Sequence, residues 1–341
     1  MNDASLRYRL PLPRGPQRAL ARAWLALGLA ALIGSGVFSI LLVLSRTPLV
    51  NQWLPGVDFF RVALVVHVDL SVLVWFVALA GMLWSIAGSA RGIAWSWAAL
   101  ALAATGAAVM AIAAFAGTGE PIMANYVPVL DRPLFLAGLL VFAAGAASLV
   151  LRSLAVAVPL GTAFDGEGVL RFGLTSAAVS GAVAILAFAA SLALVPATLA
   201  GKAYYEIVFW GGGHALQFTW TLLMLVAWLW LADAAGARLR LSPRMALLMF
   251  GLALASVFAT PYAYLAHPVA SVEHRNVLTW AMRLGGGVAI VPVALAVVTA
   301  LVADRRVARR RVHDAAARPL RAALVWSITL FAAGGLVGVF I

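Results

Sequence analysis

The chain has 341 residues, of which 64% are hydrophobic and 11% are charged, and its mean hydropathy is +1.02. No soluble domain of this length can hide so much apolar surface from water, so the composition excludes a soluble protein and indicates a membrane protein. The formal net charge of +12 does not indicate a nucleic-acid partner, because most of the arginines stand in short segments between long apolar runs. The absence of cysteine excludes disulfides, thiolate metal sites and covalent attachment of a c-type haem to this polypeptide.

The chain begins with a basic segment, residues 1–18, which we expect to lie in the cytoplasm. This segment leads into an apolar run of membrane-spanning length without a small-residue cleavage pattern, so we expect no cleaved signal peptide. We expect residues 19–341 to form a single transmembrane helical domain. Apolar runs of about 20 residues predict nine spans, near residues 19–45, 62–88, 93–117, 133–151, 172–196, 204–231, 245–266, 276–302 and 322–341.

The charges between the spans orient the predicted bundle. Most arginines stand at one set of span ends, for example Arg91, Arg171 and Arg240. Only a few, such as Arg132, stand at the opposite ends. Because positively charged loops stay in the cytoplasm, we predict a cytoplasmic N-terminus and, after nine crossings, a C-terminus outside. The expected fold class is an all-α multi-pass membrane protein, surrounded by the lipid bilayer of a bacterial-type inner membrane.

Four of the five histidines share the predicted outer half of the membrane. His67 lies about one turn into the second span, and His214 about ten residues into the sixth. His267 and His274 flank the outer turn between the seventh and eighth spans, and only His313 stands in a basic cytoplasmic loop. An ionisable side chain at membrane depth is costly unless it binds or relays something, and neutral imidazole is a common metal ligand. The cluster therefore predicts a haem or metal site near the outer face.

Each of these residues also has a purely structural interpretation. His67 either binds haem iron or is a buried side chain hydrogen-bonded to Asp69 or to a backbone carbonyl. Arg283, in the eighth span, either pairs with Asp69 or holds the propionates of a haem.

The remaining histidines leave similar alternatives. The three glycines before His214 either let the helix approach a flat cofactor closely or form a notch for helix packing. His267 and His274, beside the outer turn, are typical of solvated residues at a membrane surface.

Two stretches together resemble subunit I of the haem–copper oxygen reductases, the superfamily of cytochrome c oxidases and nitric oxide reductases. His67 stands in the sequence RVALVVHVDLSVLVWF, which is similar to the family's second helix, and it matches a low-spin haem ligand. His214 stands in FWGGGHALQFTW, which is similar to the sixth helix, and it matches a copper ligand. Thr260 and Pro261, in the seventh span, also fit the family pattern. The nine spans resemble, in order and orientation, the first nine of the family's twelve core helices.

The chain also departs from this pattern. Phe218 stands where the oxidases have a tyrosine. Leu265 and Ala266 stand where the family has a histidine pair that completes the copper site, and His267 is displaced by one residue. A copper site of the family's kind needs three nitrogens within reach. The nine spans also lack the family's tenth helix, which leaves open a fragment, a subunit completed by a second chain, and a degenerate relative.

The resemblance implies a membrane haem protein of respiratory electron transfer, and an oxidoreductase if the chain is active. His67 would bind a b-type haem, Arg283 would contact that haem, and His214 and His267 would be the candidate ligands of copper or a second metal. A second chain would supply the remaining helices and ligands, a cytochrome c-like protein would donate electrons, and oxygen or nitric oxide would accept them. Two other functions stay open, namely a haem-modifying or haem-handling membrane protein and a non-redox transporter or scaffold.

Overall fold

The computed structural model describes residues 7–54, 58–158, 164–308 and 317–340, and these are mostly helical. The helices are α1 (Pro16–Leu44), η2 (Val50–Trp53), α2 (Phe59–Val68), η3 (Asp69–Val74), α3 (Trp75–Ala87), α4 (Ile93–Ile112), α5 (Pro133–Ala155), α6 (Gly166–Leu194), α7 (Gly201–Ala234), α8 (Pro243–Val257), α9 (Ala259–Ala266), α10 (Val272–Ala308) and α11 (Ala317–Phe340). Part of the basic N-terminal segment and His313 lie outside the described residues.

Eight helical stretches of the described chain are long and apolar enough to cross a membrane. Each coincides with one of the first eight predicted spans, and the multi-pass, all-helical membrane class is therefore confirmed. The ninth predicted span corresponds to α11, which is not among these eight stretches. It packs on α7, where the Trp228 indole donates to Ser327 Oγ at 3.0 Å. The number of crossings stays a prediction.

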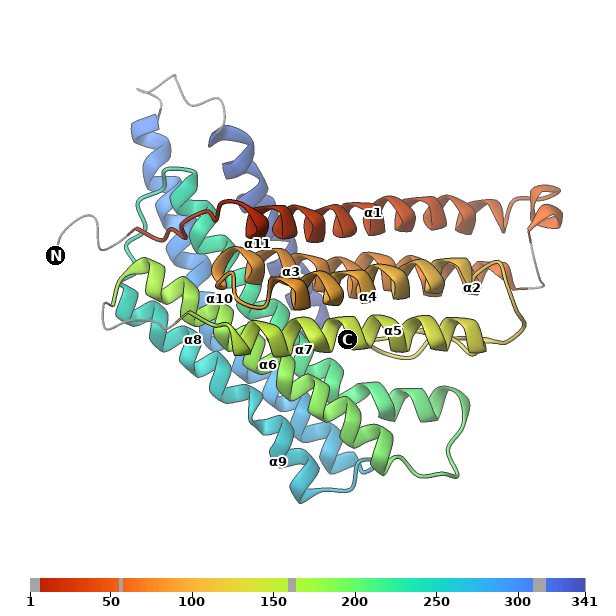
Figure 1. Cartoon of the computed structure of the whole chain (residues 1–341). Helices are drawn as coiled ribbons and strands as arrows, with labels where there is room; N and C mark the ends of the chain where they lie inside the picture. The colour runs from red at the N-terminus through yellow and green to blue at the C-terminus, as the bar shows by residue number, and fades with distance from the viewer. Residues whose placement is uncertain (1–6, 55–57, 159–163, 309–316, 341) are drawn as a thin grey trace.

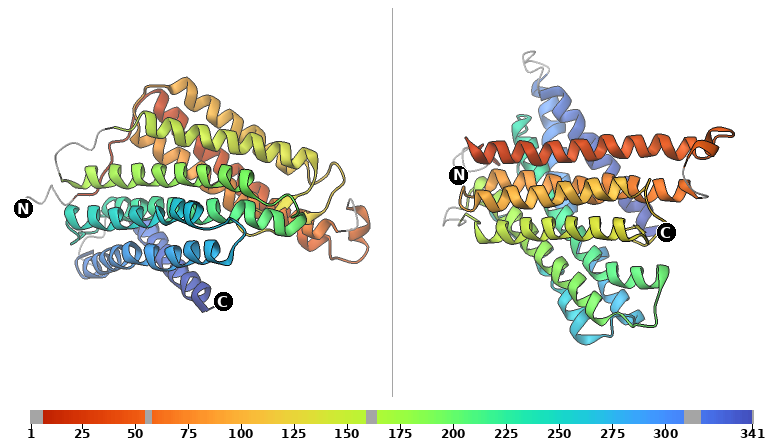
Figure 2. Two further views of the ribbon diagram at one scale, coloured as in Figure 1. Left: turned by 90° about the horizontal axis from the view of Figure 1, so that it is seen from below. Right: turned by 45° about the vertical axis from the view of Figure 1, so that its right-hand side comes forward.

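The bundle consists of two groups of helices. Helices α1 to α5 run side by side, while the helices from α6 onward are inclined to them (Figures 1 and 2). Small residues allow close approach inside each group, as is common between membrane helices. A Cβ added to Gly145 of α5 would lie 2.5 Å from the Ala103 backbone nitrogen of α4, so the two backbones nearly touch there.

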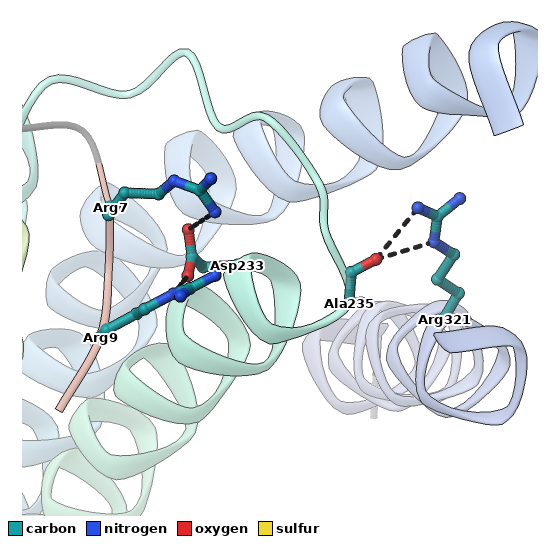
Figure 3. Close-up of polar contacts among 5 residues, drawn as sticks. All are labelled: Arg7, Arg9, Asp233, Ala235 and Arg321. Carbon is teal, nitrogen blue, oxygen red and sulfur yellow. Dashed lines mark hydrogen bonds and ion pairs between the residues drawn. The ribbon is translucent and has the colours of Figure 1, made fainter. Parts of the chain in front are cut away.

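Contacts at one end of the bundle join segments that we expect on the cytoplasmic side. The Tyr8 hydroxyl donates to the carbonyl of Leu241 at 2.8 Å, and Arg9 pairs with Asp233 at the end of α7. Figure 3 shows this pairing beside Arg321, which donates to the Ala235 carbonyl at 3.0 Å. The extended strap of residues 7–15 thus ties the end of α7 to the start of α1. Which membrane face this end occupies stays a prediction.

The segment between α4 and α5 is more than a connecting loop. It contains a short antiparallel strand pair, β1 (Pro121–Ile122) and β2 (Val129–Leu130), which an all-α expectation did not include. Arg132 fixes its base, because its guanidinium donates to the carbonyls of Ala113 at 2.8 Å and Ala114 at 3.3 Å. The hairpin packs on α2 and α5, and its tip reaches α7.

Candidate functional site

His67 of α2 is held by Ser35 of α1. Its Nδ1 lies 2.9 Å from both the carbonyl oxygen and the hydroxyl of Ser35, while that hydroxyl lies 3.0 Å from the His67 carbonyl. If the hydroxyl donates to that carbonyl, Nδ1–H donates to the Ser35 carbonyl, and Nε2 keeps its lone pair. The described residues offer Nε2 no hydrogen bond, and the imidazole is half-buried. Histidines that bind a metal are commonly oriented in this way, and a structural histidine bonded to a backbone carbonyl has the same geometry.

The helix widens directly after His67. Residues of η3 form a π-helical turn, a feature often found at functional sites. Its first residue, Asp69, is 1% exposed, and neither carboxyl oxygen has a hydrogen-bond partner among the described residues. The interpretations in which Asp69 bonds His67 or pairs with Arg283 are therefore wrong. A buried carboxyl group without a hydrogen-bond partner destabilises the fold.

His214 of α7 lies inside the bundle and is 2% exposed. Its Nδ1 is 2.9 Å from the Trp210 carbonyl, and the Tyr126 hydroxyl lies 2.9 Å from Nδ1 and 3.2 Å from Nε2. Both ring nitrogens therefore face protein groups. The tip of the hairpin also bonds α7 through Asn125, whose side chain donates to Glu206 at 2.9 Å. Burial raises the pKa of Tyr126 and the Glu206 carboxylate raises it further, so the phenol stays protonated.

Aromatic rings occupy the glycine notch before His214. A Cβ added to Gly211, Gly212 or Gly213 would lie closer than 3.0 Å to the ring of Tyr264, Phe188 or Tyr126, respectively. The three glycines thus make room for three aromatic side chains from three different segments. The packing-notch interpretation holds, and the interpretation with a flat cofactor on these glycines is wrong.

His274 is buried rather than solvated, which corrects the expectation for the outer turn. It is 1% exposed, its Nδ1 lies 3.2 Å from the Ala263 carbonyl, and its Nε2 has no hydrogen-bond partner among the described residues. The ring of Tyr264 stands edge-on at 4.6 Å, and the Tyr264 hydroxyl lies 2.6 Å from that of Ser191. His267, at the end of α9, is half-buried.

The described residues contain no group of three or more histidine, cysteine, aspartate or glutamate side chains that could hold a metal ion. His214 and His267 therefore do not form a three-nitrogen copper site with a third ligand from this part of the chain. The donor set does not fit copper of the family's kind, whereas the oriented imidazole of His67 is of the kind that would hold a haem iron.

Arg283 of α10 is not brought to His67. Its guanidinium carbon lies 5.6 Å from the centre of the Trp280 ring, and the side chain is exposed. Helix α10 packs on α7, α8 and α9, while α2 packs on α1 and the hairpin (Figure 1). Contact between Arg283 and a haem on His67 has no support in this arrangement.

Three residues that shape the site were not found from the sequence. Tyr126 and Tyr264 contact the histidines from segments far away in the chain, which periodicity does not show. Ser35 was missed as well, although the sequence carries a signal for it, namely a hydroxyl within the first predicted span.

No family model and no solved structure matches the chain. An uncharacterized protein of Rickettsia prowazekii is 24% identical over 381 residues, which cover 94% of this chain and 72% of that protein. An uncharacterized protein of Aquifex aeolicus is 26% identical over 268 residues, which cover 78% of this chain and 65% of that protein. The chain thus spans roughly two thirds to three quarters of the length of these bacterial relatives, whose names state no activity.

Proposed function

We propose that this multi-pass membrane protein binds a b-type haem through His67 and takes part in respiratory electron transfer in a bacterial inner membrane. The observation that carries the proposal is the geometry of one imidazole, whose Nδ1 is held by Ser35 while Nε2 has no hydrogen bond within the described part of the chain. The resemblance of the segment around His67 to a haem-binding helix points the same way, and both relatives are bacterial.

The residues around His67 suit this role. The Ser35 carbonyl accepts the Nδ1 proton, which keeps the imidazole in the tautomer that can bind iron through Nε2. The Ser35 hydroxyl lies within 3.0 Å of the His67 carbonyl, so α1 holds both the ring and the backbone of this residue. A bound haem supplies an iron centre that gains and loses one electron.

His67 would hold the haem iron through its imidazole, and a second chain would supply the rest of the haem pocket. Because the His67 side chain is only half-buried, such a chain can dock beside it. A cytochrome c-like donor and a gaseous acceptor, oxygen or nitric oxide, belong to this proposal as expectations from the resemblance. Copper has no ligand set among the described residues and is not included.

The experiment compares haem content in single variants of the purified chain. His67→Ala should lose the haem, whereas His267→Ala, which removes another half-buried imidazole, should retain it. His67→Gly leaves a cavity in which added imidazole can replace the lost ligand, so the spectrum should return with imidazole. Unchanged haem content in His67→Ala would refute the assignment.

A non-redox scaffold or transporter is the second candidate. His214 favours it, because its ring is buried and its two nitrogens lie within hydrogen-bond distance of the Tyr126 hydroxyl or the Trp210 carbonyl, as in a structural histidine. A scaffold predicts a colourless protein whose histidine variants change stability and nothing else. The same spectra therefore separate the two functions.

A further inference from the structure

An open groove of about 780 Å³ lies between α8–α9 and α10. Ala255, Ser256 and Ala259 line one wall, and Ala281 and Gly285 line the other. A Cβ added to Gly285 would lie closer than 3.0 Å to Ser256, so the two helices touch at this depth.

The groove opens toward the membrane rather than toward the centre of the bundle. On its rim, Trp280 is 55% exposed, Leu284 66% and Val288 46%. These side chains are apolar and belong to a helix of spanning length, so lipid surrounds them. A molecule can therefore enter the groove sideways from the bilayer.

The polar residues of the groove are the half-buried His267 and the exposed Glu273 and Asn276. His267 caps the end of α9, and Glu273 and Asn276 stand in the first two turns of α10, so the groove has a polar end and an apolar length. No lysine or arginine lines it, and Glu273 makes no salt bridge among the described residues. Arg283 stacks on Trp280 and is not a lining residue.

These groups define the chemistry of the occupant. A phosphate head group is best held by arginine or lysine, and the Glu273 carboxylate repels it. A neutral head that donates hydrogen bonds suits a carboxylate, an imidazole and an amide. A long apolar tail suits the alanine and glycine walls, and the volume lies within the range of small-molecule sites.

We propose that this groove binds a lipid-soluble quinol, with its head ring at His267, Glu273 and Asn276 and its isoprenoid tail along α10. The site does not depend on haem at His67, since the groove residues belong to α8, α9 and α10, whereas His67 packs on α1.

The test is a titration of the full chain in lipid nanodiscs with reduced decyl-ubiquinone, followed by quenching of tryptophan fluorescence. Trp280→Phe should remove part of the quenching, because Trp280 is on the rim. Glu273→Gln should weaken binding about tenfold, the effect of losing one charge-assisted hydrogen bond at about 1.4 kcal/mol. Ala281→Phe fills the groove and should abolish saturable binding.

Two control variants match these changes. Glu120→Gln removes an exposed carboxylate from the α4–α5 segment, and Val291→Phe enlarges a 56% exposed side chain of α10 that does not line the groove. Both should bind within twofold of the unmodified chain. If Ala281→Phe does not fold, Ala259→Leu fills the groove from the opposite wall and should also abolish saturable binding of the quinol.

Binding by Ala281→Phe or Ala259→Leu with unchanged affinity would overturn the proposal. So would displacement of the quinol by an equal concentration of short-chain phosphatidylglycerol, because the groove would then be a phospholipid site. We expect His67→Ala to lose haem and to bind the quinol with unchanged affinity. The failure of one site can therefore be told from the failure of the other.

Discussion

Gly213→Ala tests whether the glycine notch is filled by aromatic rings. The added Cβ would lie 2.6 Å from Cδ1 and Cδ2 of Tyr126, where ordinary contact begins at 3.4 Å, so the ring must retreat by about an ångström. Tyr126 has little freedom to do so. Its hydroxyl bonds His214, its neighbour Asn125 bonds Glu206, and its backbone has φ 69°, a left-handed conformation that is strained for a tyrosine.

The size of the effect follows from three contributions. Overpacking of a filled site costs about 1–3 kcal/mol, and loss of the phenol–imidazole hydrogen bond costs about 1 kcal/mol. The better helix propensity of alanine stabilises the folded chain by up to about 1 kcal/mol. We therefore expect the free energy of unfolding to fall by about 1–3 kcal/mol.

The assay is a denaturant titration of the purified chain in detergent, followed by circular dichroism. Gly251→Ala is the matched control, because no atom lies within 4 Å of a Cβ at this helical glycine of α8. Gly251→Ala should raise the free energy of unfolding by up to about 1 kcal/mol. In the Tyr126→Ala background the ring is absent, so Gly213→Ala should then change the free energy of unfolding little. Equal stability of Gly213→Ala and Gly251→Ala would refute the packing that we describe.

Three further predictions concern buried polar groups. Asp233→Ala should speed protease cleavage of the N-terminal strap and lower stability by up to about 1 kcal/mol, since Arg7 and Arg9 are largely exposed partners. Lys202→Ala, which removes the largely exposed partner of a surface pair, should change neither. Asp69→Leu should raise the free energy of unfolding by about 1–3 kcal/mol, because it removes a buried carboxyl group that has no hydrogen-bond partner among the described residues. A loss of stability would show that Asp69 has a partner. Burial raises the pKa of Tyr126, so the folded chain keeps a proton that the unfolded chain releases, and stability should fall as the pH rises above about 10. Tyr126→Phe should lessen that fall in a series of denaturant titrations at increasing pH, and an identical pH profile would count against the buried phenol.

Much of the fold follows from apolar runs alone. The predicted spans 93–117 and 245–266 correspond to α4 and to α8 with α9, since runs of this length have few other stable forms in lipid. The hairpin between α4 and α5 escaped prediction, because strands of two residues carry no periodic signal.

The candidate site could be predicted only in part. The hydrogen bond of His67 to a backbone carbonyl was one of the expected alternatives, but the acceptor, Ser35, is 32 positions away in the chain. The partners of His214 and His274 come from the hairpin and from α9, so only the folded arrangement places them. The sequence could show that a histidine within the membrane has a free-energy cost. The structure shows which neighbours form hydrogen bonds and contacts with each of these histidines.

The most direct test of a haem on His67 is a reduced-minus-oxidised optical spectrum of the purified chain, with haem and copper measured on the same sample. We predict a b-type spectrum with little copper. A colourless protein that stays colourless when it is expressed with ample haem would contradict the haem assignment and favour a scaffold or transporter.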